Sequence, residues 1–255
     1  MTQSKGHGRV KFNSEAQMVL WPASDFEKLQ RYYFRLNKKT HDVSQKSLHA
    51  RQLFHKYVFS KEESDRLNYE RAKNDAEDEQ TVLDQLIKKL EFQTSNYRYA
   101  DKKNGFEITN NQVVYPDKII IEKNSLVNPA LKVYAQQIAN AGTEEFRYIA
   151  SGKSSLPTTP EMNRLIDENS RLDIFVNGGY RNPNGDIVRE GVIFPPALDD
   201  ALIKEFGSFT SPQFDSGTMQ WRNVIETPSE QLQHDQGQTF YSIAHATILE
   251  ITFIE

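Results

Sequence analysis

The chain closes on the stretch Ser242-Ile-Ala-His-Ala-Thr-Ile-Leu-Glu-Ile-Thr-Phe-Ile254, in which apolar and polar side chains alternate from Leu249 to Phe253. This alternation predicts a half-buried strand. The hundred residues before it hold further short candidate strands between turns, at positions 146–150, 172–176, 191–194, 201–206 and 218–225. Short strands at such spacing are typical of an antiparallel β-sandwich.

Glycine and proline divide the chain near residue 100. Ten of the 12 glycines and nine of the 10 prolines lie after that point. Because these two residues interrupt regular structure most strongly, the shift predicts a helical region over residues 1–100 and a β-sandwich domain over residues 101–255. The expected fold class is therefore α+β. Strands are also expected at 113–115 and 118–121, and a short helix at 130–141, opened by Pro129 and closed by Gly142.

The N-terminal region carries two helix-start patterns. Ser24 and Ser60 are each followed three residues later by a glutamate, which is the spacing of a capping box. Apolar residues recur at helical spacing over 26–36 and again over 48–58, so we expect the helical region to extend over about residues 15–95. The segment 61–90 is rich in charged residues and has a narrow apolar stripe, a pattern found in helices that cross between bodies or pair in coiled coils.

Six apolar residues are candidates for an interface. Four fall on one face of the helix expected over 61–90, and two belong to aromatic clusters earlier in the chain; they are Leu83, Leu86, Ile87, Leu90, Tyr33 and Phe54. They either pack within the chain or anchor a neighbouring subunit, since large aromatic side chains dominate interface cores. The sequence leaves both alternatives open, although the charged segment before Leu83 is expected to face solvent.

Composition argues against nucleic-acid binding, disulfides and membrane insertion. The formal net charge is −4, so no global basic field favours nucleic acid. Cysteine is absent, which excludes disulfides and thiolate metal sites. No stretch approaches the roughly 18 consecutive apolar residues of a membrane span, and the N-terminus lacks the apolar region of a secretory signal. We expect a mature chain that does not insert into a membrane.

Catalytic and metal-binding patterns are weak. Gly152-Lys153-Ser154 follows a candidate strand, but the first glycine of a phosphate-binding loop would fall at Arg147, so a polar turn is the better interpretation. His41, His49 and His55 lack the i, i+4 spacing of a helical metal site, and His245 is expected to be a half-buried strand residue. No carboxylate pair lies in the surroundings of a glycosidase site. We therefore expect no enzyme activity, no metal and no cofactor.

The order of elements in residues 125–255 resembles a domain of tail and baseplate proteins of tailed bacteriophages. That domain carries a strand like YIAIG, a segment like TAP…L..E..R, a strand like I.E.GLF, a strand like GT…R and a closing I.I.F strand. The matching residues here are Tyr148-Ile149-Ala150 with Gly152, Thr159-Pro160 with Leu165, Glu168 and Arg171, Ile203 to Phe209, Gly217-Thr218 with Arg222, and Ile248 to Phe253. The chain departs from the pattern at Ser151, Lys153 and Ser208.

The resemblance implies a structural subunit of a virion, in the tail, baseplate or neck, assembled in the host cytoplasm. Its partners would be other virion proteins and copies of itself. The alternative is a module of the tail-fibre or adhesin type that binds the host surface, with the segment 177–185 as the contact loop. The same segment also fits a long hairpin turn.

Overall fold

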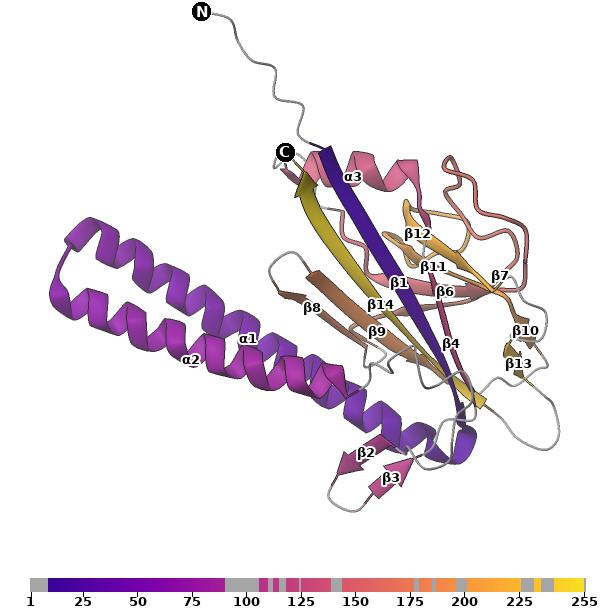
Figure 1. The fold of residues 1–255 in the computed structure, drawn as a ribbon, viewed down its shortest axis with the longest axis horizontal. Coiled ribbons are helices and arrows are strands. Elements are labelled where there is room, and N and C mark those ends of the chain that lie inside the picture. Colours follow the sequence, from indigo (N-terminus) through magenta and orange to yellow (C-terminus); the bar gives the residue numbers. More distant parts are fainter. Residues whose placement is uncertain are drawn as a thin grey trace, which may run out of the picture.

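The structure is a computed structural model that describes residues 9–89, 106–109, 112–114, 118–123, 125–138, 144–176, 179–184, 187–195, 201–225, 232–234 and 241–254. It is built from a helical hairpin and two five-stranded antiparallel sheets (Figure 1). The predicted α+β class is therefore confirmed, with helices in the N-terminal part and antiparallel sheets that extend to the C-terminus.

The first sheet contains the two longest strands of the described chain. In spatial order it consists of β4 (Lys118–Lys123), β1 (Arg9–Pro22), β14 (Tyr241–Ile254), β9 (Ile187–Phe194) and β8 (Tyr180–Asn184). β1 and β14 pair along their whole length, from Arg9 opposite Ile254 to Pro22 opposite Tyr241. The two ends of the described chain are thus joined at the centre of one sheet.

The second sheet forms the other layer of a sandwich. In spatial order it consists of β5 (Ser125–Leu126), β12 (Met219–Val224), β11 (Glu205–Phe209), β6 (Tyr148–Gly152) and β7 (Glu168–Asp173). Two small pairs complete the strands: β2 (Phe106–Thr109) with β3 (Gln112–Val114), and β10 (Ala201–Ile203) with β13 (Leu232–His234).

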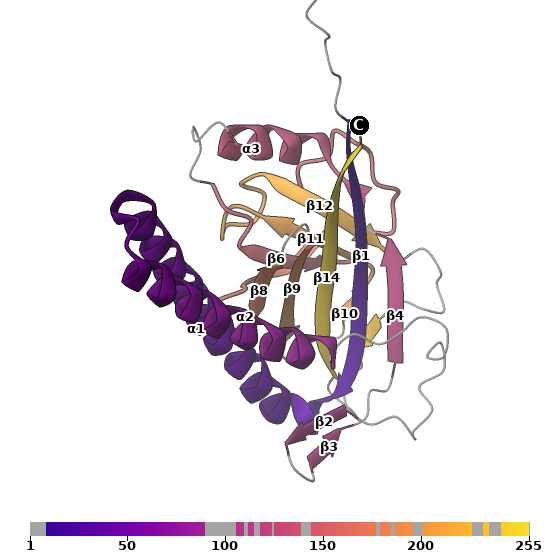
Figure 2. The ribbon, with the colours of Figure 1, turned by 60° about the vertical axis from the view of Figure 1, so that its left-hand side comes forward.

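Three helices accompany the sheets. α1 (Phe26–Ser60) follows a short 3-10 turn, Ala23–Asp25, and α2 (Glu63–Lys88) runs back along it. Figures 1 and 2 show that the start of α1 and the end of α2 lie against the first sheet, whereas the other end of the hairpin projects away from the strands. α3 (Asn128–Ile138) packs through Ala130 and Val133 against Phe146.

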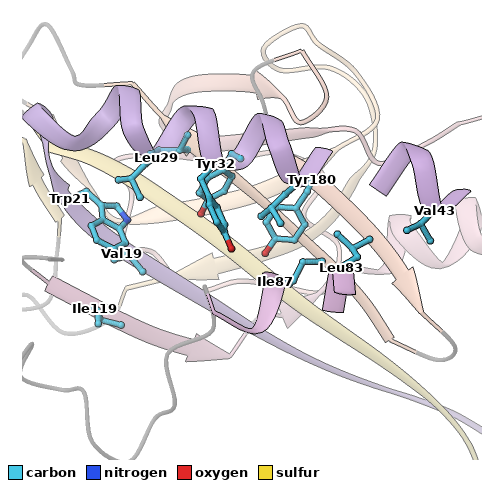
Figure 3. Packing of buried hydrophobic residues seen from close by; sticks show 12 residues of the cluster. Val19, Trp21, Leu29, Tyr32, Val43, Leu83, Ile87, Ile119 and Tyr180 are labelled. Atoms are coloured by element: carbon cyan, nitrogen blue, oxygen red, sulfur yellow. The ribbon is translucent and has the colours of Figure 1, made fainter. Parts of the chain in front are cut away.

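Strand alternation divides the core into two layers. Met18 and Val192 of the first sheet meet Phe206 and Trp221 of the second in the sandwich core. The residues next to them in sequence, Val19 and Ile193, point to the opposite face and pack beneath α1 and α2, together with the cluster shown in Figure 3. Because each buried large apolar side chain stabilises the fold by about 1.5–3 kcal/mol, the first sheet is held from both faces.

The predicted boundaries need three corrections. Residues 9–22 are a strand of the sandwich, so the expected helical region does not begin at residue 15. The two helices expected over 26–36 and 48–58 are one continuous helix, α1. Only residues 172–173 of the stretch 172–176 belong to a strand, because β7 ends at Asp173 and a turn follows. The helix expected over 61–90 is confirmed as α2. The short helix expected over 130–141 is present as α3, which begins at Asn128, and its expected end at Gly142 lies outside the described residues.

Candidate docking surface

The base of the helical hairpin is fixed to the sandwich by packing and by hydrogen bonds. The Tyr32 hydroxyl donates to the backbone oxygen of Leu86 at 2.8 Å, which joins α1 to α2. Asn37 Nδ2 donates to the backbone oxygen of Phe175 at 3.0 Å. Asn182 of β8 donates to Asp84 Oδ1 of α2 at 3.0 Å. These contacts set the direction in which the hairpin leaves the body.

The middle of the hairpin has charged side chains where a coiled coil has apolar ones. Lys46 Nζ lies 2.9 Å from Glu79 Oε1 and 3.0 Å from Asp75 Oδ1, and Lys39 pairs with the other oxygen of Glu79. Hydrogen bonds from Lys39 and then Lys46 hold the pKa of Glu79 below its usual value. A charged layer of this kind fixes the register of two helices but adds little stability.

The hairpin turn is closed by a second polar cluster. Asp65 is buried, and its carboxylate accepts hydrogen bonds from Lys56 Nζ and the Ser60 hydroxyl, each at 2.7 Å. These two donors, Lys56 first, lower the pKa of Asp65. Lys61 adopts the left-handed conformation with φ of 53° and donates its N–H to the oxygen of Tyr57, which ends α1.

The expected capping boxes do not form. Asp25 and Glu62 occupy the N-cap positions of α1 and α2, and neither makes a side-chain cap hydrogen bond. The prediction was therefore wrong at both helix starts. At the second, the Ser60 hydroxyl accepts from the N–H of Glu62 at 3.2 Å, inside the turn.

Apolar side chains are exposed where the hairpin turns. We call this set the hairpin tip: Phe54, Val58, Phe59 and Leu67, exposed by 43%, 44%, 86% and 42%. Phe54 is partly supported, since its ring centroid lies 5.1 Å from that of Tyr69. A projecting apolar end is costly in water unless a partner covers it, and exposed apolar patches mark interaction sites.

The predicted interface residues fall into three groups. Tyr33, Leu83 and Ile87 are buried between the helices and the first sheet, and Leu86 packs beside them half-buried. Phe54 is exposed at the hairpin tip. Leu90 lies outside the described residues.

Most of the predicted stripe therefore fixes the hairpin to its own body and does not form an exposed patch. The segment of α2 before Leu83 is largely exposed, as expected, with Asp65 and Ala76 as buried exceptions.

The six predicted interface residues do not include the two most distal members of the tip on α1, Val58 and Phe59. The helical spacing of Val43, Ala50 and Tyr57 directs the inner face of α1 toward α2. Val58 and Phe59 are displaced from that row by one and two residues, so they point away from α2. This offset was the signal that could have found them.

A cleft of about 640 Å³ lies between α1 and the end of the sandwich. Small polar residues of α1 line one side of it and aromatic residues the other; the lining includes Asn37, Ser44, Ser47, Tyr134, Phe146 and Gln220. Gln220 Nε2 donates to the Tyr134 hydroxyl, and burial raises the pKa of Tyr134 to about 12.

The position considered as a phosphate loop already contains an anionic side chain. Glu205 Oε1 accepts hydrogen bonds from the backbone N–H groups of Ser154, at 3.3 Å, and Asp167, at 3.1 Å. A Cβ on Gly152 would lie 2.6 Å from this oxygen, so glycine is required there by the carboxylate and not by a phosphate.

The described part of the chain offers no metal site. No cluster of three His, Cys, Asp or Glu residues that could hold an ion occurs within it. His41, His49 and His55 are exposed on α1. The side chains of His234 and His245 lie outside the description, so the expectation of a half-buried His245 stays a prediction.

The segment expected as a host-contact loop is a strand in its described part. Tyr180–Asn184 forms β8, which pairs with β9. Tyr180 and Asn182 are 1% and 2% exposed, facing α1 and α2. These two side chains therefore cannot contact a receptor, because the protein's own hairpin covers them.

The residues that carry the resemblance to phage tail proteins meet in two buried ion pairs. Arg171 Nε lies 2.6 Å from Glu168 Oε1, and its guanidinium also stacks on the ring of Phe209 at 3.9 Å. Arg222 Nε donates to Glu205 Oε2 at 2.7 Å.

The arginines of the two pairs also bind the loops around the second sheet. Arg171 donates to the backbone oxygens of residues 211, 213 and 216, and Arg222 donates to the oxygen of Leu156 at 2.7 Å. These four residues of the motif thus hold two loops onto the second sheet, whereas the closing part of the motif, Ile248 to Phe253, lies in β14 of the first sheet.

Comparison with protein-family models, with curated proteins and with solved structures gave no match.

Proposed function

We propose that this chain is a structural subunit of a tailed-phage virion, in the tail, baseplate or neck, and that it docks to a neighbouring virion protein through the hairpin tip. The observation that carries the docking is the exposure of Phe59, 86%, at the far end of a hairpin whose base is fixed to the sandwich. A helical hairpin with a fixed base and an exposed apolar end can extend from the body and bind a partner at that end.

The physical chemistry of the tip supports a protein partner. Aromatic side chains inserted into a partner's pocket account for much of the affinity of protein interfaces, and a few such residues dominate. The tip offers two phenylalanines flanked by Val58 and Leu67, with charged residues such as Lys61 and Glu63 around them. An apolar centre with a polar rim is the usual anatomy of an interface.

The assignment to a virion is supported by the resemblance and by the contacts of its residues. Glu168 with Arg171, and Glu205 with Arg222, hold loops onto the second sheet, so these four residues of the motif share a structural purpose. In this role the sandwich is a rigid body, and the arm supplies the contact to a neighbour. None of the helices that the structure describes is long and apolar enough to cross a membrane.

Mass spectrometry of purified virions tests the proposal. The chain is expected in particles at a fixed ratio to the major tail proteins, and a Phe59→Ser variant is expected to be depleted from them. A Gln52→Ser variant, exposed on the same helix but outside the tip, serves as the matched control and should be incorporated normally. Absence of the wild-type chain from particles would refute the virion role.

A further inference from the structure

The two five-stranded sheets have four edge strands, and three of them are protected against pairing with another chain. β8 contains Pro183, which has no N–H to donate to a new strand. β5 is only two residues long. β7 is polar, Glu168-Asn-Ser-Arg-Leu-Asp173, with an internal ion pair. Short length, proline and charge are the usual means by which proteins block sheet edges.

The fourth edge strand, β4, is six residues long and contains no proline, and its charged residues are Lys118, Glu122 and Lys123. Its six residues read Lys118-Ile-Ile-Ile-Glu-Lys123, and its inner side pairs with β1 from Leu20 opposite Lys118 to Glu15 opposite Lys123. In the part of the chain that the structure describes, no strand pairs with its outer side, and Figure 2 shows it at the margin of the first sheet beside β1. A bare edge with three isoleucines is a template for strand addition.

The charges of β4 are complementary to themselves in the antiparallel direction. When two copies of the strand run antiparallel about Ile120, Lys118 of each copy falls opposite Glu122 of the other, and Ile119 falls opposite Ile121. Opposite charges and β-branched pairs directly across two strands are favourable, whereas like charges there are unfavourable. A two-fold axis through Ile120 places Lys118 and Glu122 of each strand opposite a residue of the other sign.

The packing of Ile119 adds a second argument. Ile119 is 8% exposed and belongs to the cluster between the first sheet and the helices. Because Ile121 lies two residues further on, it occupies the same face of the sheet. Pairing of Ile119 with Ile121 of a second copy therefore continues that apolar face across the new strand boundary.

We propose that two copies of this chain pair through β4 to form one continuous ten-stranded antiparallel sheet. The pairing uses backbone hydrogen bonds along the outer side of β4, and the two Lys118–Glu122 pairs fix its register and direction. This interface is separate from the hairpin tip and does not depend on the virion role. It adds a surface through which copies of the chain associate.

Charge reversal tests the dimer with the full chain. The wild type is expected to be dimeric by analytical ultracentrifugation at micromolar concentration. Lys118→Glu places glutamate opposite Glu122 twice, and Glu122→Lys places lysine opposite Lys118 twice. Each single variant should weaken the dimer by roughly tenfold or more, from the loss of two favourable pairs and the gain of two unfavourable ones.

Two rescues are specific to this register. Mixing the two single variants should restore dimers that contain one copy of each, because all pairs are then of opposite charge. The double variant Lys118→Glu with Glu122→Lys should dimerise like the wild type. Circular dichroism should show the same fold for every variant.

A monomeric wild type, single variants that dimerise as well as the wild type, or failure of both rescues in folded protein would each overturn the proposal. None of these results bears on the presence of the chain in virions, so the two proposals fail separately.

Discussion

Arg222 and Glu205 form an ion pair in which both side chains are fully buried, with Arg222 Nε 2.7 Å from Glu205 Oε2. The pair does more than join β11 to β12. Glu205 also accepts from the N–H of Asp167, and Arg222 donates to the oxygen of Leu156, so both ends of the loop over 153–167 are held through these two side chains.

Removing one partner of this pair should destabilise the fold strongly. Glu205→Leu leaves the Arg222 charge buried without its carboxylate, and loss of one member of a buried pair costs about 3–5 kcal/mol. Urea unfolding measures the change in the free energy of unfolding. Glu27→Gln, which breaks the exposed Glu27–Arg31 pair, is the matched control and should cost less than about 1 kcal/mol.

A double variant, Glu205→Leu with Arg222→Met, separates the buried charge from the lost loop contacts. It should be more stable than Glu205→Leu alone, since no unpaired charge remains. It should stay below the wild type, because the N–H groups of Ser154 and Asp167 have lost their acceptor. A double variant no more stable than Glu205→Leu would contradict the role given to the ion pair.

The variant Gly152→Ala tests how closely the Glu205 carboxylate packs against residue 152. The new Cβ would lie 2.6 Å from Glu205 Oε1 and 2.7 Å from the backbone oxygen of Asp167. Overpacking of this kind costs about 1–3 kcal/mol. Thermal unfolding should therefore show a lower Tm, whereas Lys153→Ala at the exposed neighbouring position should leave it nearly unchanged. Equal Tm values for the two variants would show that the site can relax.

Acidification should loosen the turn of the hairpin. The pKa of Asp65 is lowered in the folded state by Lys56 and Ser60. A carboxyl whose pKa is lower when folded stabilises the fold at pH values above its unfolded pKa of about 3.9, and that stability disappears as the pH falls through the folded value. Protection factors of amides near the turn, which correct for the intrinsic effect of pH on exchange, should fall below about pH 4. In Asp65→Asn this dependence should be much reduced.

Protection from hydrogen exchange should fall along α2 toward the tip. The base of the hairpin is packed with large side chains such as Leu36, Leu83 and Ile87, whereas its distal half relies on Ala50 and Ala76 and on charged pairs. Amides around residues 80–88 should therefore exchange slowly and those around 54–68 quickly. Uniform protection along the hairpin in the free protein would mean that the distal half is stable without a partner.

The fold could be predicted in outline, and the failure at β1 has a clear physical origin. The change in glycine and proline content near residue 100 correctly separated the helices from most strands. It concealed β1, although Val10, Phe12, Ala16 and Met18 alternate with polar residues at the period of a strand. A local signal was present, but β14, one of the two strands that pair with β1, lies more than two hundred residues away, at the other end of the chain.

The candidate site was harder to predict, because burial depends on contacts that are distant in sequence. Leu83 and Ile87 share a helical stripe that fits a partner surface or an internal core equally well. Only the position of the first sheet, with Tyr180 beside them and Trp21 in the same cluster, assigns them to the core (Figure 3). Phe59 lies two residues beyond the helical row Val43, Ala50 and Tyr57 that faces α2, and its exposure also follows from the end of α1 at Ser60.

Site-specific photo-cross-linking in assembled particles tests docking by the hairpin tip most directly. A photoreactive phenylalanine analogue replaces Phe59, and in a control chain it replaces Asn74, which is exposed on α2 away from the tip. Docking predicts a covalent adduct between position 59 and another virion protein, at higher yield than from position 74. Particles that contain the chain but give no adduct from position 59 would contradict it.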